Sequence, residues 1–249
     1  MRTVPFRWKN CHADSLPHRY VAMAQSYIRD IVEPSLSSLE RQIARLRALD
    51  DDPLAEFGID PAEELLRNTV LGYCLSLQAL WEKQLRGYLY RCAIDFSRNP
   101  SMLQQIEKAN WQQLDDLFKN LRGVALTDFV EYPQLNLLHL LGNVCRHGSG
   151  TSVRRLVLSH PELWRGELKS KSAVPPLSHP DPEPERTAEN LHISLPLIAS
   201  LASAIDSFWS ETVYIYNESI ERKHPSLERS LAEERKKRAG RGRPWDPPA

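Results

Sequence analysis

Apolar residues recur every three or four positions along much of the chain, a spacing that predicts helices. The pattern is clearest from Tyr132 to Gly150, where the apolar positions fall on two helix faces: Leu135, Leu138, Leu141 and Cys145 on one, and Leu137, Leu140 and Val144 on the other. A helix that is apolar on most sides is expected inside a bundle. Gly148 is expected to end it, because glycine adopts the left-handed conformation of a helix C-cap at little cost.

The same periodicity predicts the remaining elements. An apolar stripe begins near Ser15 and is kinked or ended at Pro34, because proline removes a helix hydrogen bond. Asp60 followed by Pro61 has the form of a helix start, and an apolar face then continues to Cys92. Shorter patterns cover residues 102–108, 111–121, 152–159 and 194–220. No strand pattern stands beside a turn signal, so we predict an all-α fold: a helical bundle of four or five principal helices with short accessory helices.

The strength of these patterns divides the chain into three parts. Residues 1–17 show no readable period and are expected to form an irregular N-terminal arm. Residues 18–222 are expected to form the bundle, in which the proline-rich segment 168–190 is an exposed loop. Residues 223–249 are polar and contain the basic run Arg235-Lys236-Lys237-Arg238, so we expect a disordered basic tail that either stays solvated or binds nucleic acid.

Composition narrows the classes of function. The formal net charge of the 249 residues is zero, so no field of the whole molecule attracts nucleic acid or a membrane. The N-terminus lacks the apolar run of a signal peptide, and residues 193–209 are too short and polar to span a bilayer, which favours a cytoplasmic protein without membrane contact.

The sequence motifs give no sign of a cofactor or a metal. The four cysteines have no close paired spacing, which argues against a zinc knuckle or a redox motif, and Cys74 and Cys145 are expected to be buried on apolar faces. Glycine-rich phosphate loops are absent from the sequence. His139 and His147 lie about 12 Å apart along a helix, too far to share one metal ion. We expect His139 to be a hydrogen-bonded core residue.

The end of the 132–150 helix carries the most distinctive chemistry. Arg146 and His147 fall in its last turn, and Asn143 lies one turn before His147 on the same face. Basic residues are also ordinary at helix C-termini, so capping alone is one interpretation. The other interpretation is an RNA site. RNA carries its own nucleophile, the 2′-hydroxyl, so a metal-free ribonuclease has only to position that group, stabilise the phosphorane and move a proton.

The run Asn143-Val144-Cys145-Arg146-His147-Gly148 at the end of an apolar helix resembles the signature of HEPN (higher eukaryote and prokaryote nucleotide-binding) domains. The later segments 154–156 and 161–164, and a final helix with Phe208-Trp209, resemble a bacterial branch of that family. This resemblance implies a HEPN-like bundle and a homodimer in which two motif helices form one cleft. It also implies a metal-independent endoribonuclease of a toxin–antitoxin or phage-defence system, with RNA as substrate and an antitoxin or another protein as partner.

By the same resemblance, His147 is the catalytic histidine and Asn143 the polar residue of the motif. The family also has an arginine four to six residues clear of the histidine, where this chain has Gly142, Leu141 or Leu140. Two interpretations remain. Either Arg146 takes over the phosphate contact, or the chain is a catalytically inactive HEPN-like module that binds a partner in a defence or regulatory complex. Gly142 itself either admits a partner helix or relieves crowding in the core.

Overall fold

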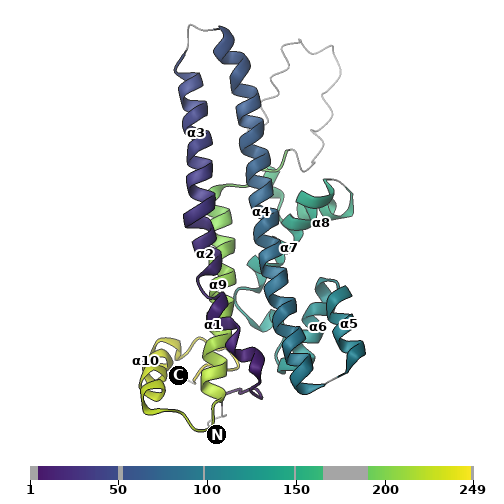
Figure 1. Ribbon diagram of the computed structural model, residues 1–249, viewed down its shortest axis with the longest axis vertical. Coiled ribbons are helices and arrows are strands. Elements are labelled where there is room, and N and C mark those ends of the chain that lie inside the picture. Colours follow the sequence, from purple (N-terminus) through teal and green to yellow (C-terminus); the bar gives the residue numbers. More distant parts are fainter. Residues whose placement is uncertain (1–4, 50–52, 98, 149, 165–189, 248–249) are drawn as a thin grey trace. The chain divides into compact units, whose positions relative to one another are not determined.

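The structure is a computed structural model that describes residues 5–49, 53–97, 99–148, 150–164 and 190–247. All regular elements in these ranges are helices, which confirms the all-α prediction (Figure 1). In chain order they are η1 (His12–Ser15), α1 (Pro17–Tyr20), α2 (Met23–Tyr27), η2 (Ile28–Val32), α3 (Glu33–Arg47), α4 (Pro53–Phe96), α5 (Pro100–Lys108), α6 (Trp111–Arg122), η3 (Leu126–Asp128), α7 (Tyr132–His147), α8 (Thr151–Ser159), η4 (Pro161–Trp164), α9 (Leu195–Ser219) and α10 (Pro225–Arg238).

The chain divides into two compact units, whereas the sequence predicts a single bundle over 18–222. Unit 1 contains Met1–Ser26, Leu80–Leu135 and Leu201–Ala249, and unit 2 contains Tyr27–Ala79 and Asn136–Ser200. Helices α4, α7 and α9 each contribute residues to both units. The physical reason is helix length: the 44 residues of α4 extend over about 65 Å, which is more than one small core can cover.

The core of unit 1 is aromatic. Phe208 of α9 packs against Trp81 of α4, with ring centroids 4.9 Å apart, and against Phe129 at 4.5 Å. Phe118 of α6 packs edge-on against Phe129 at 5.9 Å. All four side chains are at most 2 % exposed, so they supply much of the apolar burial that holds this unit together.

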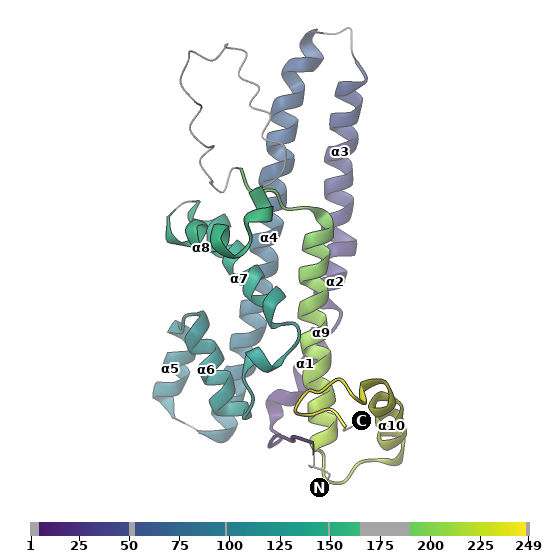
Figure 2. The same ribbon diagram turned by 180° about the vertical axis from the view of Figure 1, so that it is seen from behind.

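The C-terminal segment belongs to this core, which corrects the prediction of a disordered basic tail. Residues Pro225–Arg238 form α10, and Figure 2 shows α10 beside the C-terminal part of α9. Trp245 is completely buried and lies 4.7 Å from Phe129, while Arg238 binds Glu211 of α9 at 2.6 Å. The segment packs because several residues of its basic run pair with acidic side chains of α9 and α10, so their charges are compensated without full solvation.

Unit 2 contains an antiparallel helix pair, formed by α3 and the first part of α4 (Figure 1). Arg47 binds Glu63 at 2.6 Å across the pair, and Leu46 contacts Gly58. Helix α4 begins at Pro53, seven residues before the predicted start, so Pro61 lies inside it. Pro61 and Phe57 are both exposed, so water has access to the Phe57 carbonyl that Pro61 leaves unbonded.

The break predicted at Pro34 is wrong. The helical stripe is interrupted near Ala22, which has a φ of +66°, and Pro34 lies in the first turn of α3, where its missing N–H removes no hydrogen bond of that helix.

The helices predicted over 102–108, 111–121, 152–159 and 194–220 are confirmed close to their expected bounds. The side chain of Asn110 caps α6, Gly123 ends it with a φ of +79°, and the Ser194 hydroxyl accepts a hydrogen bond from the Leu197 N–H at the start of α9. The proline-rich loop predicted over 168–190 lies outside the described residues, apart from its last position.

Candidate functional site at the end of helix α7

Helix α7 ends as its sequence predicts. Gly148 adopts a φ of +69°, and its N–H donates to the Val144 carbonyl at 2.8 Å. Leu138, Leu141 and Val144 are completely buried. Arg146 and His147 are exposed in the last turn, so the helix presents a guanidinium and an imidazole to solvent.

The Arg146 side chain is held in place by a hydrogen bond to a buried residue of α4. Its Nη2 donates to Oε1 of Gln78 in α4 at 3.1 Å, and Gln78 is only 1 % exposed. Gln78 reaches this position because Gly142 has no side chain: a Cβ built on Gly142 would stand 2.5 Å from Cγ of Gln78. The contact that explains Gly142 is therefore with α4 of the same unit.

The Asn143 side chain is directed to the preceding turn. Its Nδ2 lies 3.0 Å from Nε2 of His139, and both residues are half-buried. Among the described residues, the hydrogen bond of Asn143 thus runs to His139 and not to His147. His139 is a hydrogen-bonded residue, as expected. The candidate residues therefore fall into two pairs: Arg146 and His147 are exposed, whereas Asn143 is hydrogen-bonded to His139.

The chain on either side of this helix end carries basic residues and no acidic ones. The sequence has no acidic residue between Tyr132 and Glu162. Arg154 and Arg155 are exposed on α8, the next helix of the same unit. No side chain caps the N-terminus of α8, where Gly150 has a φ of +89°, and a Cβ on Gly148 or Gly150 would meet no described atom within 4 Å. Backbone N–H groups at a helix N-terminus, two glycines and basic side chains are the groups that bind phosphate.

A cysteine pair joins the last turn of α7 to α4. Cys74 of α4 is buried, and Cys145 of α7 is half-buried. A hydrogen bond from the Cys74 thiol lowers the pKa of Cys145 below its ordinary value. The same hydrogen bond, together with burial, raises the pKa of Cys74. The sequence predicts that both cysteines are buried; this is confirmed for Cys74, whereas Cys145 is partly open to solvent because it lies in the last turn of α7.

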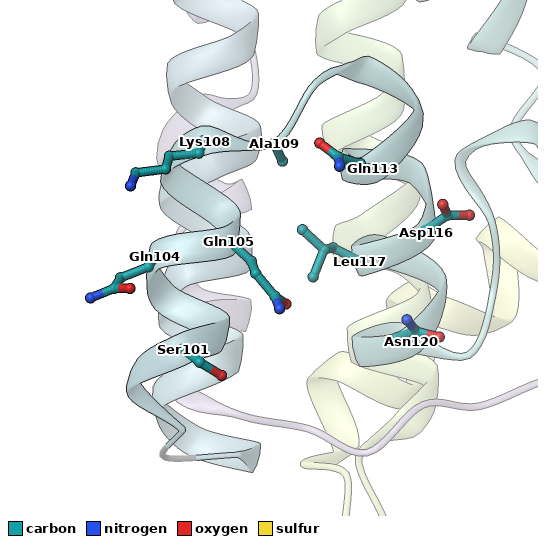
Figure 3. Close-up of a pocket in the computed structure, with 9 residues that line it drawn as sticks. All are labelled: Ser101, Gln104, Gln105, Lys108, Ala109, Gln113, Asp116, Leu117 and Asn120. Carbon is teal, nitrogen blue, oxygen red and sulfur yellow. The ribbon is translucent and has the colours of Figure 1, made fainter.

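A hollow in unit 1 has no signal in the sequence. It lies between α5 and α6 and has a volume of about 570 Å³ (Figure 3). Gln105 and Leu117 point into the space between the two helices, whereas Lys108 points away. The Oε1 atom of Gln113, also at this hollow, accepts a hydrogen bond from the Asn110 N–H, so this amide serves the helix cap. The charged residues of the lining, Lys108 and Asp116, point away from each other, and the other polar groups are neutral, so the end of α7 remains the candidate site.

The described part of the chain gives no sign of a metal site or a membrane-spanning helix. No group of three His, Cys, Asp or Glu side chains there comes together in a way that would hold a metal ion. None of its helices combines the length and the apolar character needed to cross a bilayer. Comparison with protein-family models, with curated proteins and with solved structures finds no match, so the functional argument rests on the residues of the chain itself.

Proposed function

We propose that this chain is a HEPN-like, metal-independent endoribonuclease of a toxin–antitoxin or phage-defence system, which binds RNA at the end of α7. The observation that carries the proposal is the exposed Arg146–His147 pair, whose guanidinium is oriented by buried Gln78 within a segment free of acidic residues. A guanidinium has five N–H donors, so one bond to Gln78 fixes its direction and leaves others for a phosphate.

In the proposed reaction His147 moves the proton and Arg146 stabilises the charge. The imidazole of His147 takes the proton of the 2′-hydroxyl, whose oxygen attacks the adjacent phosphorus. The bond from phosphorus to the 5′-oxygen breaks, and the leaving 5′-oxygen takes a proton from water. Arg146 and the N-terminal N–H groups of α8 bind the phosphoryl oxygens as negative charge grows on them. The products are a 2′,3′-cyclic phosphate and a free 5′-hydroxyl. Asn143 positions His139 and contributes to the shape of the site from behind. We further propose a homodimer that joins two such helix ends in one groove.

The direct test is cleavage of RNA by purified protein in the presence of EDTA, with mass spectrometry of the product ends. His147→Ala is expected to abolish cleavage while the circular dichroism spectrum is unchanged. His192→Ala is the matched control, because His192 is also an exposed histidine of unit 2, and it is expected to retain full activity. A folded wild-type protein that cleaves none of a varied set of RNAs would contradict the proposal.

A second candidate function is a HEPN-like module that binds RNA or a protein partner without turnover. It is favoured by Gly142, which stands where the family has one of its arginine positions and is packed against Gln78. This candidate predicts RNA binding that survives His147→Ala. Under either candidate, RNA binding can be titrated at several salt concentrations, and the logarithm of the affinity falls linearly with the logarithm of the salt concentration. In the double variant Arg154→Ala, Arg155→Ala, the steepness of this fall is expected to decrease by about 0.7 for each RNA phosphate that is no longer neutralised.

A further inference from the structure

Two cysteines that are far apart in sequence meet in unit 1. Cys11 precedes η1 and Cys92 lies in α4, and their Sγ atoms are 3.7 Å apart. Both are free thiols. A disulfide requires about 2 Å between the sulfurs, so the two sulfurs have to move closer together before they bond. The two residues differ in access, because Cys92 is completely buried and Cys11 is half-buried.

A buried guanidinium lies beside this cysteine pair. Nη1 of Arg122 lies 3.4 Å from Sγ of Cys11 and 4.0 Å from Sγ of Cys92. Arg122 is only 2 % exposed and also pairs with Asp14 at 2.8 Å. A positive charge that is nearer to Cys11 favours the thiolate there over the thiolate at Cys92.

Hydrogen bonding acts in the same direction. The thiol of Cys92, by donating to Cys11, makes the largest contribution to a pKa of Cys11 below its ordinary value. Burial and the Asp14 carboxylate oppose this effect, and Arg122 adds to it. Burial raises the pKa of Cys92, so Cys92 remains the protonated partner.

Solvent has access to the Cys11 side of the pair. Cys11 lines a surface hollow of about 710 Å³, together with Asn10, His12, Asp95 and Tyr216. This hollow is large enough for a small hydroperoxide to reach the sulfur. A partly exposed, low-pKa thiol with a second thiol at van der Waals distance has the features of an oxidisable cysteine.

We propose that Cys11 and Cys92 form a thiol site that is oxidised by hydroperoxides to a reversible disulfide. The Cys11 thiolate attacks the peroxide, an S–O bond forms, the O–O bond breaks, and the leaving alkoxide or hydroxide takes a proton from water. The Cys92 sulfur then attacks the sulfenic sulfur, and its proton leaves with the departing hydroxide as water. The thiols lose two electrons and the peroxide gains them. This site is independent of the proposed ribonuclease activity.

The test treats the reduced full-length protein with hydrogen peroxide, blocks remaining thiols with N-ethylmaleimide and maps the peptides by mass spectrometry. A Cys11–Cys92 cross-link is expected, with two thiols consumed and both restored by dithiothreitol. Before oxidation, Cys11 is expected to react with iodoacetamide faster than the completely buried Cys74. Cys11→Ser is expected to abolish the cross-link and leave Cys92 reduced. In Cys92→Ser, Cys11 is expected to stay as a sulfenic acid that dimedone labels.

Cys145→Ser is the matched control, because it removes the half-buried thiol of the other cysteine pair and is expected to leave the Cys11–Cys92 link intact. The wild-type mapping does not depend on whether Cys92→Ser folds. The proposal is overturned if the folded wild-type protein forms no Cys11–Cys92 link, or if Cys11 reacts no faster than the completely buried Cys74.

Discussion

The buried amide oxygen of Gln78 accepts a hydrogen bond from Arg146, the exposed arginine beside His147, at 3.1 Å. Gln78 reaches Arg146 by crossing α7 at Gly142, the only position on this helix without a side chain. One glycine, one glutamine and one arginine therefore form a support that fixes the guanidinium. This relationship gives Arg146 a defined direction, which a phosphate-binding residue requires.

The first prediction concerns Gly142→Ala. The new Cβ would stand 2.5 Å from Cγ of Gln78, so we expect the free energy of unfolding, measured with urea, to fall by about 1–3 kcal/mol. Gly72→Ala is the control, because a Cβ there meets no described atom within 4 Å, and in α4 it is expected to stabilise by about 1 kcal/mol. Adding Gln78→Ala to Gly142→Ala is expected to recover part of the loss. Equal effects of both glycine substitutions would contradict the packing argument.

The second prediction concerns the pH dependence of stability at Asp246. Burial raises the pKa of its carboxyl above the ordinary value, and Glu211 adds to this. The folded chain then holds the proton more tightly than the unfolded chain, so stability falls as the pH rises from the ordinary carboxyl pKa, about 4, through the raised value. Asp246→Asn imitates the protonated form. We expect it to be more stable than wild type at pH 7 and to lose this advantage towards pH 4, as measured by thermal unfolding across pH.

Glu211→Gln provides the contrast for this experiment. Burial alone would raise the pKa of Glu211, but hydrogen bonds from Arg238 and Trp245 lower it below the ordinary value. Its contribution to stability is therefore present above the ordinary carboxyl pKa and lost as the pH falls through the lowered value. Glu211→Gln is expected to cost about 3–5 kcal/mol at pH 7, because it removes the buried carboxylate that binds both Arg238 and Arg243, and to cost less in acid. Parallel pH profiles for both variants would argue against these assignments.

The third prediction concerns the C-terminal segment. Trp245 is completely buried against Phe129, so Trp245→Ala is expected to lower the free energy of unfolding by about 3–5 kcal/mol. Trp111→Ala, at a half-buried tryptophan, is the control and is expected to cost less. If the Trp245 variant unfolded at the wild-type urea concentration, the segment would not be docked in solution.

The fourth prediction concerns the ion pair between Asp14 and Arg122, both of which are buried. Arg122→Met leaves the Asp14 carboxylate with the Tyr88 hydroxyl but without its cation, and is expected to cost about 3–5 kcal/mol. The double variant Asp14→Leu, Arg122→Met is expected to cost less than the sum of the two single variants. Urea unfolding of all four proteins measures this coupling, and strict additivity would exclude it.

Local sequence determined the secondary structure around the candidate site. Helix α7 and its end at Gly148 follow from apolar spacing and from the glycine that its C-cap favours, and both signals lie within a few residues of the structure they specify. The exposure of Arg146 and His147 follows from the same local rule, because they occupy the last turn before that cap.

Tertiary structure decided which side chains meet. Gln78 and Arg146 are 68 residues apart, Cys11 and Cys92 are 81 apart, and no local pattern reports such pairings. The docking of Trp245 likewise depends on the aromatic core of unit 1, although a lone tryptophan in a polar segment was a signal that pointed to it. Periodicity and capping are properties of neighbouring residues, whereas an orienting hydrogen bond, a thiol pair and a buried tail depend on how distant helices pack.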